Sequence, residues 1–94
     1  MIALLAEISS LNEKVKICHA DLDSLLQHLQ KFENAYKMSS QEFFRRFANG
    51  GLPHATDFFE WYAYLDMSKK LVGRIREMER ELGETLEQKL LASA

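Results

Sequence analysis

Cys18, His19, His28 and His54 are the side chains of this sequence best suited to bind a soft metal ion such as zinc. A zinc site needs ligands that converge on one point, often a CxxC pair or two histidines one helical turn apart. Cys18 and His19 are adjacent, so on a helix they would point about 100° apart. The spacing therefore predicts no metal site. We expect solvated or half-buried histidines, and Cys18 as a small buried residue.

Three carboxylates, Asp57, Glu60 and Asp66, lie near Trp61 and Tyr64 in the sequence. Paired carboxylates can perform general acid–base catalysis. Asp57 and Glu60 are better explained as charges that stabilise the N-terminus of a helix. The sequence contains no serine–histidine–acid arrangement, no phosphate-binding loop and no glycine-rich fingerprint after a strand. We therefore expect no catalytic residue, no cofactor and no enzyme activity.

Length and composition favour one small domain over residues 1–94. The formal net charge of −2 gives no electrostatic reason to expect nucleic-acid binding. No run approaches the roughly 20 apolar residues of a membrane span, and the apolar start meets Glu7 too early for a signal peptide. A single cysteine excludes an intrachain disulfide, which fits a reducing compartment. We expect a cytoplasmic protein without membrane contact.

The first segment carries the clearest pattern in the sequence. Apolar residues recur in steps of three and four without a slip: Met1, Leu4, Ile8, Leu11, Val15, Cys18, Leu22, Leu25, Leu29, Phe32 and Tyr36. This heptad repeat, the signature of coiled coils, predicts one helix over about residues 2–37. Leu5 and Leu26 widen the apolar stripe, which is typical of a helix that meets more than one neighbour.

A short helix is predicted over about residues 40–48. Ser39 is a suitable N-cap, and Glu42 three residues later completes a capping box. The run Asn49–Gly51 ends this helix, because a residue near Gly50 can adopt the left-handed conformation of a helix C-cap.

The third helix is predicted over about residues 55–91, with Thr56 or Asp57 as its N-cap. Its apolar set is broad at first and then narrows to a stripe that includes Leu82, Leu86 and Leu90. Gly73 and Gly83 each disfavour the helix by about 1 kcal/mol relative to Ala. We expect close helix approach at Gly73 and fraying near Gly83, with a break at Gly83 as the alternative.

Together these segments predict an all-α fold: an antiparallel helical hairpin of two long helices joined by a short one. Residues whose numbers sum to about 95 should then pair, which places Phe32 and Tyr36 beside residues 58–64. The same register places Leu4 and Ile8 beside residues 86–90. Two helices bury only one stripe each, so we expect two copies to form a homodimeric four-helix bundle, or a complex with another protein.

The turn between the long helices concentrates the aromatic residues. Four of them are predicted to form a core at the end of the hairpin: Phe43, Phe47, Phe58 and Trp61. The others point around too much of the helix circumference for one chain to bury all of them. Because aromatic anchors are common in binding hot spots, we predict the following partner-binding residues: Phe44, Phe59, Tyr62 and Tyr64.

The strings KMSSQEFFRRFANGGL (residues 37–52) and TDFFEWYAYLDM (residues 56–67) resemble a phrase in a group of small prokaryotic proteins. In that group the phrase joins two coiled-coil arms, and its members look like antitoxins of the kind paired with TumE-type toxins. The chain differs at Gly51 and at residues 53–56, where acidic residues are usual. The resemblance implies an antitoxin that binds a cognate toxin.

From its residues alone, the chain is expected to be a non-enzymatic protein–protein interaction module. The resemblance implies, more specifically, the antitoxin of a toxin–antitoxin pair. The alternative is a structural coiled-coil adaptor that only self-assembles and has no toxin partner.

Overall fold

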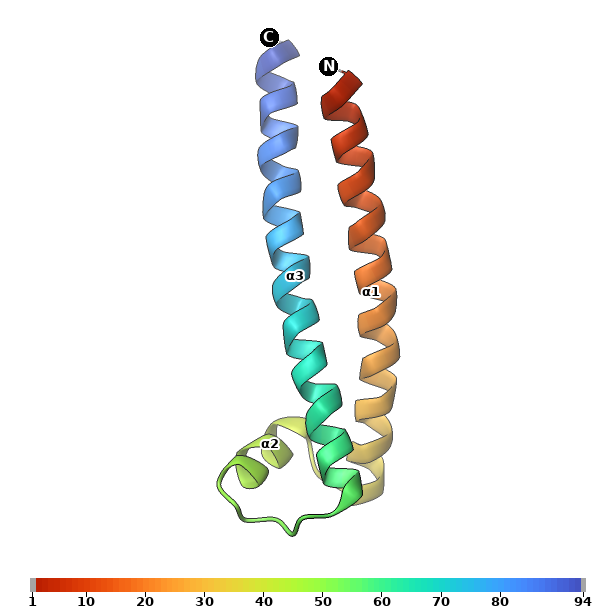
Figure 1. Cartoon of the computed structure of the whole chain (residues 1–94), viewed down its shortest axis with the longest axis vertical. Coiled ribbons are helices and arrows are strands. Elements are labelled where there is room, and N and C mark those ends of the chain that lie inside the picture. Colours follow the sequence, from red (N-terminus) through yellow and green to blue (C-terminus); the bar gives the residue numbers. More distant parts are fainter. Residues whose placement is uncertain (1, 94) are drawn as a thin grey trace.

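The computed structural model describes residues 2–93, and over this range the chain forms three helices and no strand. They are α1 (Ile2–Tyr36), α2 (Ser40–Ala48) and α3 (Thr56–Ser93). Figure 1 shows α1 and α3 side by side in opposite directions, with α2 at the end where the chain turns. The hairpin is elongated, with extents of 60 × 21 × 17 Å. The predicted all-α helical hairpin is confirmed.

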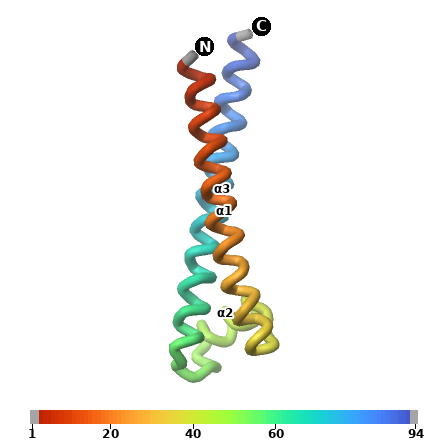
Figure 2. Tube along the Cα trace, turned by 90° about the vertical axis from the view of Figure 1, so that its right-hand side faces the viewer, coloured from red at the N-terminus to blue at the C-terminus, as the bar shows by residue number. Residues whose placement is uncertain are grey.

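The two long helices pair residues whose numbers sum to about 95, as predicted from the sequence. Near the turn, the ring centroids of Tyr36 and Phe58 lie 5.0 Å apart. Midway along the hairpin, Nε2 of His19 lies 3.6 Å from a carboxylate oxygen of Glu79. Figure 2 shows that α1 and α3 also cross over each other along their length. The face that α3 turns toward α1 therefore rotates gradually from one end to the other.

α1 turns its predicted apolar stripe toward α3. From Leu4 to Phe32 every member of the repeat is buried or half-buried, and Tyr36 at the end is just exposed. Leu11, Cys18 and Leu29 are the buried members. Met1, the first residue of the repeat, lies outside the described residues.

α3 packs against α1 through a heptad repeat of its own, which the spacing of apolar residues alone did not reveal. Its members are buried or half-buried and follow steps of three and four: Trp61, Tyr64, Ser68, Leu71, Ile75, Met78, Leu82, Thr85 and Lys89. The hydroxyls of Ser68 and Thr85 donate to the carbonyl oxygens one turn earlier, at 2.8 and 2.9 Å. These local hydrogen bonds allow two polar residues to be buried in an apolar stripe.

The last turns of α3 correct one prediction. The spacing of the leucines placed Leu86 and Leu90 opposite Leu4 and Ile8. In the structure the buried stripe passes through Thr85 instead, and Leu86 and Leu90 are 42% and 72% exposed. The heptad continues through polar residues, so apolar spacing alone indicated the wrong face.

The structure contradicts both the close helix approach predicted at Gly73 and the break considered at Gly83. α3 continues through Gly83 without a break. Gly73 does not mark a close helix approach, because a methyl group built on it would meet no atom within 4 Å apart from the neighbouring backbone of α3, and the same holds for Gly83. Both glycines therefore weaken the helix without making a packing contact in this chain.

α1 ends at a residue with a left-handed backbone conformation, and this residue is not glycine. Lys37 has a φ of 55°. The amide of Met38 donates to the carbonyl oxygen of Glu33 at 3.2 Å, which closes the last turn. A side chain in the left-handed region costs roughly 1–2 kcal/mol relative to glycine, so this helix end is locally strained.

α3 starts one residue earlier than its predicted caps allow. The amide of Phe59 donates to the carbonyl oxygen of Ala55 at 3.2 Å, so Thr56 and Asp57 already lie in the first turn. The predicted N-cap role of either residue is therefore wrong. The Asp57 carboxylate instead accepts a hydrogen bond of 2.5 Å from the hydroxyl of Tyr36, which ties the start of α3 to the end of α1.

Candidate interaction surface

The turn of the hairpin is built on two stacked rings that are fully buried. Trp61 of α3 and Phe43 of α2 have ring centroids 4.0 Å apart and planes that differ by 4°. Phe32 of α1 stacks on Trp61 at 5.6 Å, and Phe58 belongs to the same buried cluster. Phe47 is half-buried against this cluster. Phe43, Phe58 and Trp61 are confirmed as the predicted core, whereas Phe47 lies at its edge; with Leu29 of α1 the core joins all three helices.

Ser40 supplies the polar contact that this core requires. The indole Nε1 of Trp61 donates to Oγ of Ser40 at 2.9 Å, and the amide of Ser40 donates to Oε2 of Glu33 at 2.7 Å. Because Trp61 is inaccessible to water, this bond satisfies an indole N–H that would otherwise have no partner. No signal in the sequence indicated these contacts, because the first joins residues 21 positions apart and the second joins two different helices.

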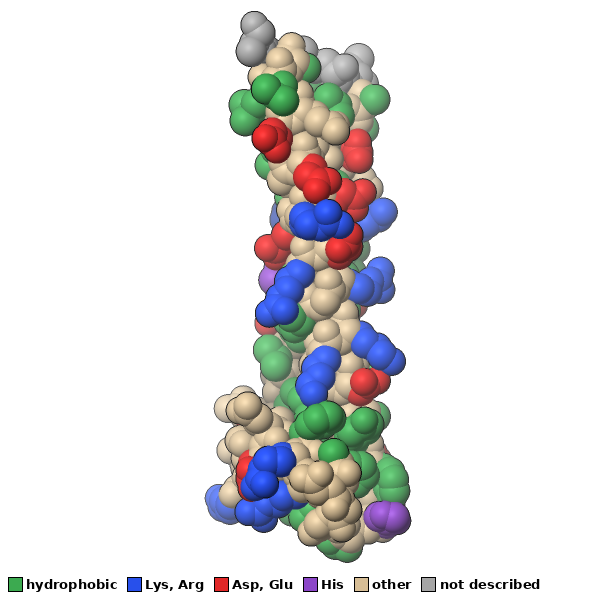
Figure 3. Space-filling model, turned by 90° about the vertical axis from the view of Figure 1, so that its left-hand side faces the viewer, with side chains coloured by type: hydrophobic (Ala, Val, Ile, Leu, Met, Phe, Trp, Pro, Cys, Tyr) green, Lys and Arg blue, Asp and Glu red, His purple; other side chains and the backbone are tan. Residues whose placement is uncertain are grey.

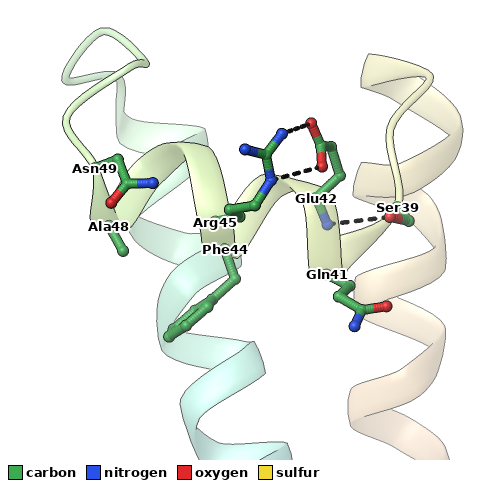
Figure 4. A pocket seen from close by; sticks show the side chains of 7 residues that line it. All are labelled: Ser39, Gln41, Glu42, Phe44, Arg45, Ala48 and Asn49. Atoms are coloured by element: carbon green, nitrogen blue, oxygen red, sulfur yellow. Dashed lines mark hydrogen bonds and ion pairs between the residues drawn. The ribbon is translucent and has the colours of Figure 1, made fainter.

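The start of α2 forms one half of the predicted capping box. Oγ of Ser39 accepts a hydrogen bond of 3.1 Å from the amide of Glu42. The Glu42 carboxylate, which a full box would turn back toward Ser39, instead binds Arg45 at 2.6 Å and Arg46 at 2.8 Å. Figure 4 shows the Ser39 and Arg45 contacts. The hydrogen bond from Arg45, followed by that from Arg46, lowers the pKa of Glu42 to about 2.

The end of α2 follows the predicted glycine cap. Gly50 is left-handed, with a φ of 73°. Its amide donates to the carbonyl oxygen of Phe47 at 3.1 Å, and the amide of Gly51 donates to that of Arg46 at 2.9 Å. This pair of bonds is a Schellman motif. With both ends of α2 fixed, the direction in which its phenylalanines point is fixed as well.

Four rings form a continuous patch outside the core, which we call the aromatic surface: Phe44, Phe47, Phe59 and Tyr62. Phe47 lies 5.3 Å from Tyr62 and 5.6 Å from Phe59, and Phe44 stacks on Tyr62 at 5.8 Å. Phe59 is 51% exposed and Tyr62 is 37% exposed, whereas Phe44 is half-buried. Figure 3 shows hydrophobic side chains gathered around α2 and the adjoining end of α3.

Tyr64 does not belong to the aromatic surface. Its ring stacks on that of His28 of α1, with centroids 4.6 Å apart and planes that differ by 3°. Residues two positions apart on a helix point about 200° away from each other, so Tyr62 and Tyr64 face different sides of α3. The structure therefore brings three of the four predicted partner-binding residues together. Phe47, assigned to the core from sequence, takes the fourth place.

Positive charge borders the aromatic surface. Nζ of Lys69 lies 3.5 Å from the centre of the Phe44 ring, a cation–π contact. Beside Phe44, an open hollow of about 580 Å³ runs along α2 between Ser39 and Asn49 (Figure 4). Arg45 lines this hollow and is exposed, and its guanidinium pairs with Glu42, which lines the hollow as well. Such a surface can hold an apolar segment of another protein and pair with acidic groups beside it.

The candidate metal ligands do not converge. Cys18 is buried in the repeat of α1. Each histidine instead lies beside a different residue of α3: His19 beside Glu79, His28 beside Tyr64 and His54 beside Phe59. Among residues 2–93, no three His, Cys, Asp or Glu side chains come together in a group that could hold a metal ion.

Two of the three candidate acid–base residues, Asp57 and Asp66, make structural contacts. Asp57 accepts the Tyr36 hydroxyl, and this hydrogen bond raises the pKa of Tyr36 above its usual value. Asp66 pairs with Lys70 at 3.0 Å. Asp57 and Asp66 are nine residues apart on one helix, about 13 Å along its axis. They are too far apart to act as paired carboxylates.

Comparisons with protein-family models, with curated proteins and with solved structures found no match for this chain. Within residues 2–93, no helix has an apolar stretch that could span a lipid bilayer. The function must therefore be inferred from the surfaces of the hairpin.

Proposed function

We propose that this chain is a cytoplasmic protein–protein interaction module that binds a second protein through the aromatic surface. The observation that carries this proposal is the exposure of Phe59 and Tyr62 on a tightly packed base. A monomer gains nothing by leaving such rings in water, whereas aromatic side chains are the commonest anchors of protein interfaces.

The packed rings beneath the aromatic surface favour binding because they limit the side-chain entropy that is lost on association. Phe47 contacts the rings of both Phe59 and Tyr62 while it packs against the buried Phe43. An aromatic side chain has only two rotatable angles, so little freedom is lost when it is buried by a partner. The surface is preorganised, and preorganisation reduces the cost of association.

For the partner we propose a protein with an apolar anchor and acidic groups around it. The anchor would contact Phe59 and Tyr62, and the acidic groups would meet Lys69, because Arg45 is already paired with Glu42. The resemblance of residues 37–67 to antitoxins makes a cognate toxin the candidate. In this proposal the hairpin neutralises the toxin by covering its active surface.

Co-expression with the product of the neighbouring gene tests the proposal. The tagged wild type should co-purify with that protein and relieve its toxicity. Phe59→Ala and Tyr62→Ala should each weaken the complex at least roughly ten-fold, the effect of a typical hot-spot residue. Met67→Ala is the matched control, because Met67 is comparably exposed on another side of α3.

Two outcomes would contradict this proposal in different ways. If the two proteins neither co-purify nor show relief of toxicity, the antitoxin function is wrong. If they bind, but Phe59→Ala and Tyr62→Ala bind as tightly as Met67→Ala, then the aromatic surface is not the interface.

A second candidate function is self-assembly as a coiled-coil adaptor. The observation that favours it is a set of exposed apolar residues outside the aromatic surface, among them Leu5, Leu26, Leu86 and Leu90. These residues belong to both long helices, and they lie where a second hairpin could cover them.

A further inference from the structure

α3 carries a second heptad repeat, beside the one that packs against α1. We call it the outer seam, and it follows steps of four and three residues throughout: Leu65, Lys69, Val72, Arg76, Glu79, Gly83, Leu86 and Leu90. It begins with Leu65 and ends with Leu86 and Leu90, and its charged members are Lys69, Arg76 and Glu79. A heptad repeat on a helix is the pattern that fits against another helix, and α1 already occupies the first repeat.

The outer seam is open to solvent over most of its length. Lys69, Arg76, Glu79, Leu86 and Leu90 are exposed, and only the other apolar members are half-buried. A groove of about 460 Å³ runs between the outer seam and α1. Apart from two basic side chains, its walls are mainly aliphatic, with Leu22, Leu26, Leu65 and Val72 among them. At the α2 end of the outer seam, Leu65 packs against the aromatic core and Lys69 contacts the Phe44 ring. From Val72 to Leu90 the hairpin therefore offers a second helix-binding face that its own chain leaves open.

We propose that a second copy of this chain packs on the outer seam in the antiparallel direction, with the two-fold axis between residues 77 and 78. The proposal rests on the second candidate function, self-assembly, and the outer seam shares only Lys69 with the border of the aromatic surface. The order of charges along the seam decides the direction. A parallel, in-register pair would set Arg76 against Arg76 and Glu79 against Glu79, which is repulsive.

The antiparallel register pairs residues of the two copies whose numbers sum to about 155. Arg76 then meets Glu79 of the second copy, an exposed carboxylate that also lies beside His19 of its own chain. The two-fold axis makes the ion pair between Arg76 and Glu79 twice. At the ends of the seam, Leu65 meets Leu90 of the second copy. Figure 3 shows the same polarity on the outer face of α3, where Lys and Arg lie toward α2 and mostly Asp and Glu lie toward the termini.

The register also gives Gly83 a role that one chain does not explain. Gly83 would face Val72 of the second copy, and space around Gly83 is open. A residue without a side chain lets a β-branched neighbour approach closely. Gly73 has equally open surroundings but lies outside the outer seam. The two glycines therefore form a matched pair for an experiment.

α1 supports the same register. Residues of α1 and α3 in one chain lie beside each other where their numbers sum to about 95. The position of each α1 residue along the long axis of the hairpin is therefore known. In the antiparallel dimer, exposed Leu5 reaches the level of Leu65 of the second copy, and exposed Leu26 reaches that of Leu86. The contact from Leu65 to Leu90 would be about 38 Å long. Over the width of one hairpin it covers roughly 700 Å² of each chain, close to the area of a standard stable interface.

Sedimentation velocity over a protein concentration range of about 1–100 μM tests the pairing. We expect a wild-type dimer, and dissociation constants for Arg76→Glu and for Glu79→Arg that are roughly ten-fold higher, because each change makes two repulsive contacts. The double variant Arg76→Glu/Glu79→Arg should return to within about three-fold of the wild type. Arg74→Glu, outside the outer seam, is the charge control. Circular dichroism verifies that every variant is helical.

The glycine pair provides a second, independent measurement. Gly83→Arg places a long charged side chain in the seam, and we expect it to weaken the dimer at least roughly ten-fold. Gly73→Arg makes the same chemical change outside the seam, and we expect the dimer to persist. Equal effects of the two substitutions would overturn the proposed register.

A spin label attached through Gln41→Cys in a Cys18→Ser background reports whether the two copies run antiparallel or parallel. In the antiparallel dimer the two labels should lie on the order of 50–60 Å apart, because the turns point away from each other. A monomer at about 100 μM, a label distance below about 30 Å, or a charge swap that does not restore the dimer would each overturn the proposal. Phe59→Ala and Tyr62→Ala should leave the dimer intact, so failure here is separate from failure of the aromatic surface.

Discussion

The hydrogen bond between Trp61 and Ser40 provides a direct test of how the turn is held together. Trp61 is inaccessible to solvent and its Nε1 donates to Oγ of Ser40 at 2.9 Å. Ser40→Ala removes the acceptor and leaves the indole N–H buried without a partner. An unsatisfied buried donor costs about 1–3 kcal/mol. We expect a loss of about 2 kcal/mol in the free energy of unfolding, or roughly 8–16 °C in Tm for a chain of this size.

The assay is urea denaturation followed by far-UV circular dichroism, with all variants at one protein concentration, because association changes apparent stability. A double-mutant cycle with Trp61→Phe isolates the bond, since phenylalanine has no N–H to satisfy. We expect a coupling energy of about 1–2 kcal/mol between Ser40 and Trp61. In the wild type the fluorescence of Trp61, the single tryptophan, should shift to the red on unfolding.

Ser39 provides the matched control. It is the neighbouring serine and caps α2 through the amide of Glu42. Ser39→Ala should cost about 1 kcal/mol through the lost cap, equally in the wild-type background and in the Trp61→Phe background. The reasoning is refuted if Ser40→Ala costs the same in both backgrounds, or if it costs less than Ser39→Ala in the wild type.

Three further outcomes follow from the structure. Gly73→Ala should stabilise the protein by up to about 1 kcal/mol, because the added methyl meets no neighbouring side chain and alanine favours the helix. Thermal melts measure this change, and a destabilised variant would contradict the open surroundings of Gly73. Lys37→Gly should stabilise it by roughly 0.5–1 kcal/mol because glycine tolerates a positive φ, whereas Lys37→Ala should give no gain. Glu42 has a pKa of about 2 when folded, below the ordinary 4.5, so its stabilising effect is complete above pH 4.5 and is lost as pH falls toward 2. Carboxyl NMR titration measures this pKa directly, and a midpoint near the ordinary 4.5 would show that the pairs with Arg45 and Arg46 do not persist in solution.

The heptad repeat of α1 could be predicted because its members are nearly all aliphatic or aromatic. The repeat of α3 has the same spacing but includes Ser68, Thr85 and Lys89, so a search for apolar residues missed it. Ser68 and Thr85 satisfy their hydroxyls within their own helix. A polar residue of this kind can occupy a buried position, and its identity alone does not reveal which position it takes.

The aromatic surface could be predicted only in part. Adjacent residues on a helix cannot face one neighbour, and this argument separated exposed Phe59 from buried Phe58 correctly. It could not decide on which side of the hairpin Tyr64 would lie, because that depends on the position of α1. The ring of Tyr64 stacks on His28 of α1, so Tyr64 lies outside the aromatic surface.

The sequence by itself determined the helices and their order. Periodicity and caps are local properties, and Ser39, Gly50 and the repeat of α1 encode them within a few residues. Only the tertiary structure decided which face of α3 is buried, which serine meets Trp61, and which rings remain in water. Those outcomes depend on contacts between residues far apart in the sequence, such as Ser40 and Trp61, which are 21 positions apart. A side chain's exposure is set by the neighbour that reaches it, and the neighbour is known only once the helices have packed.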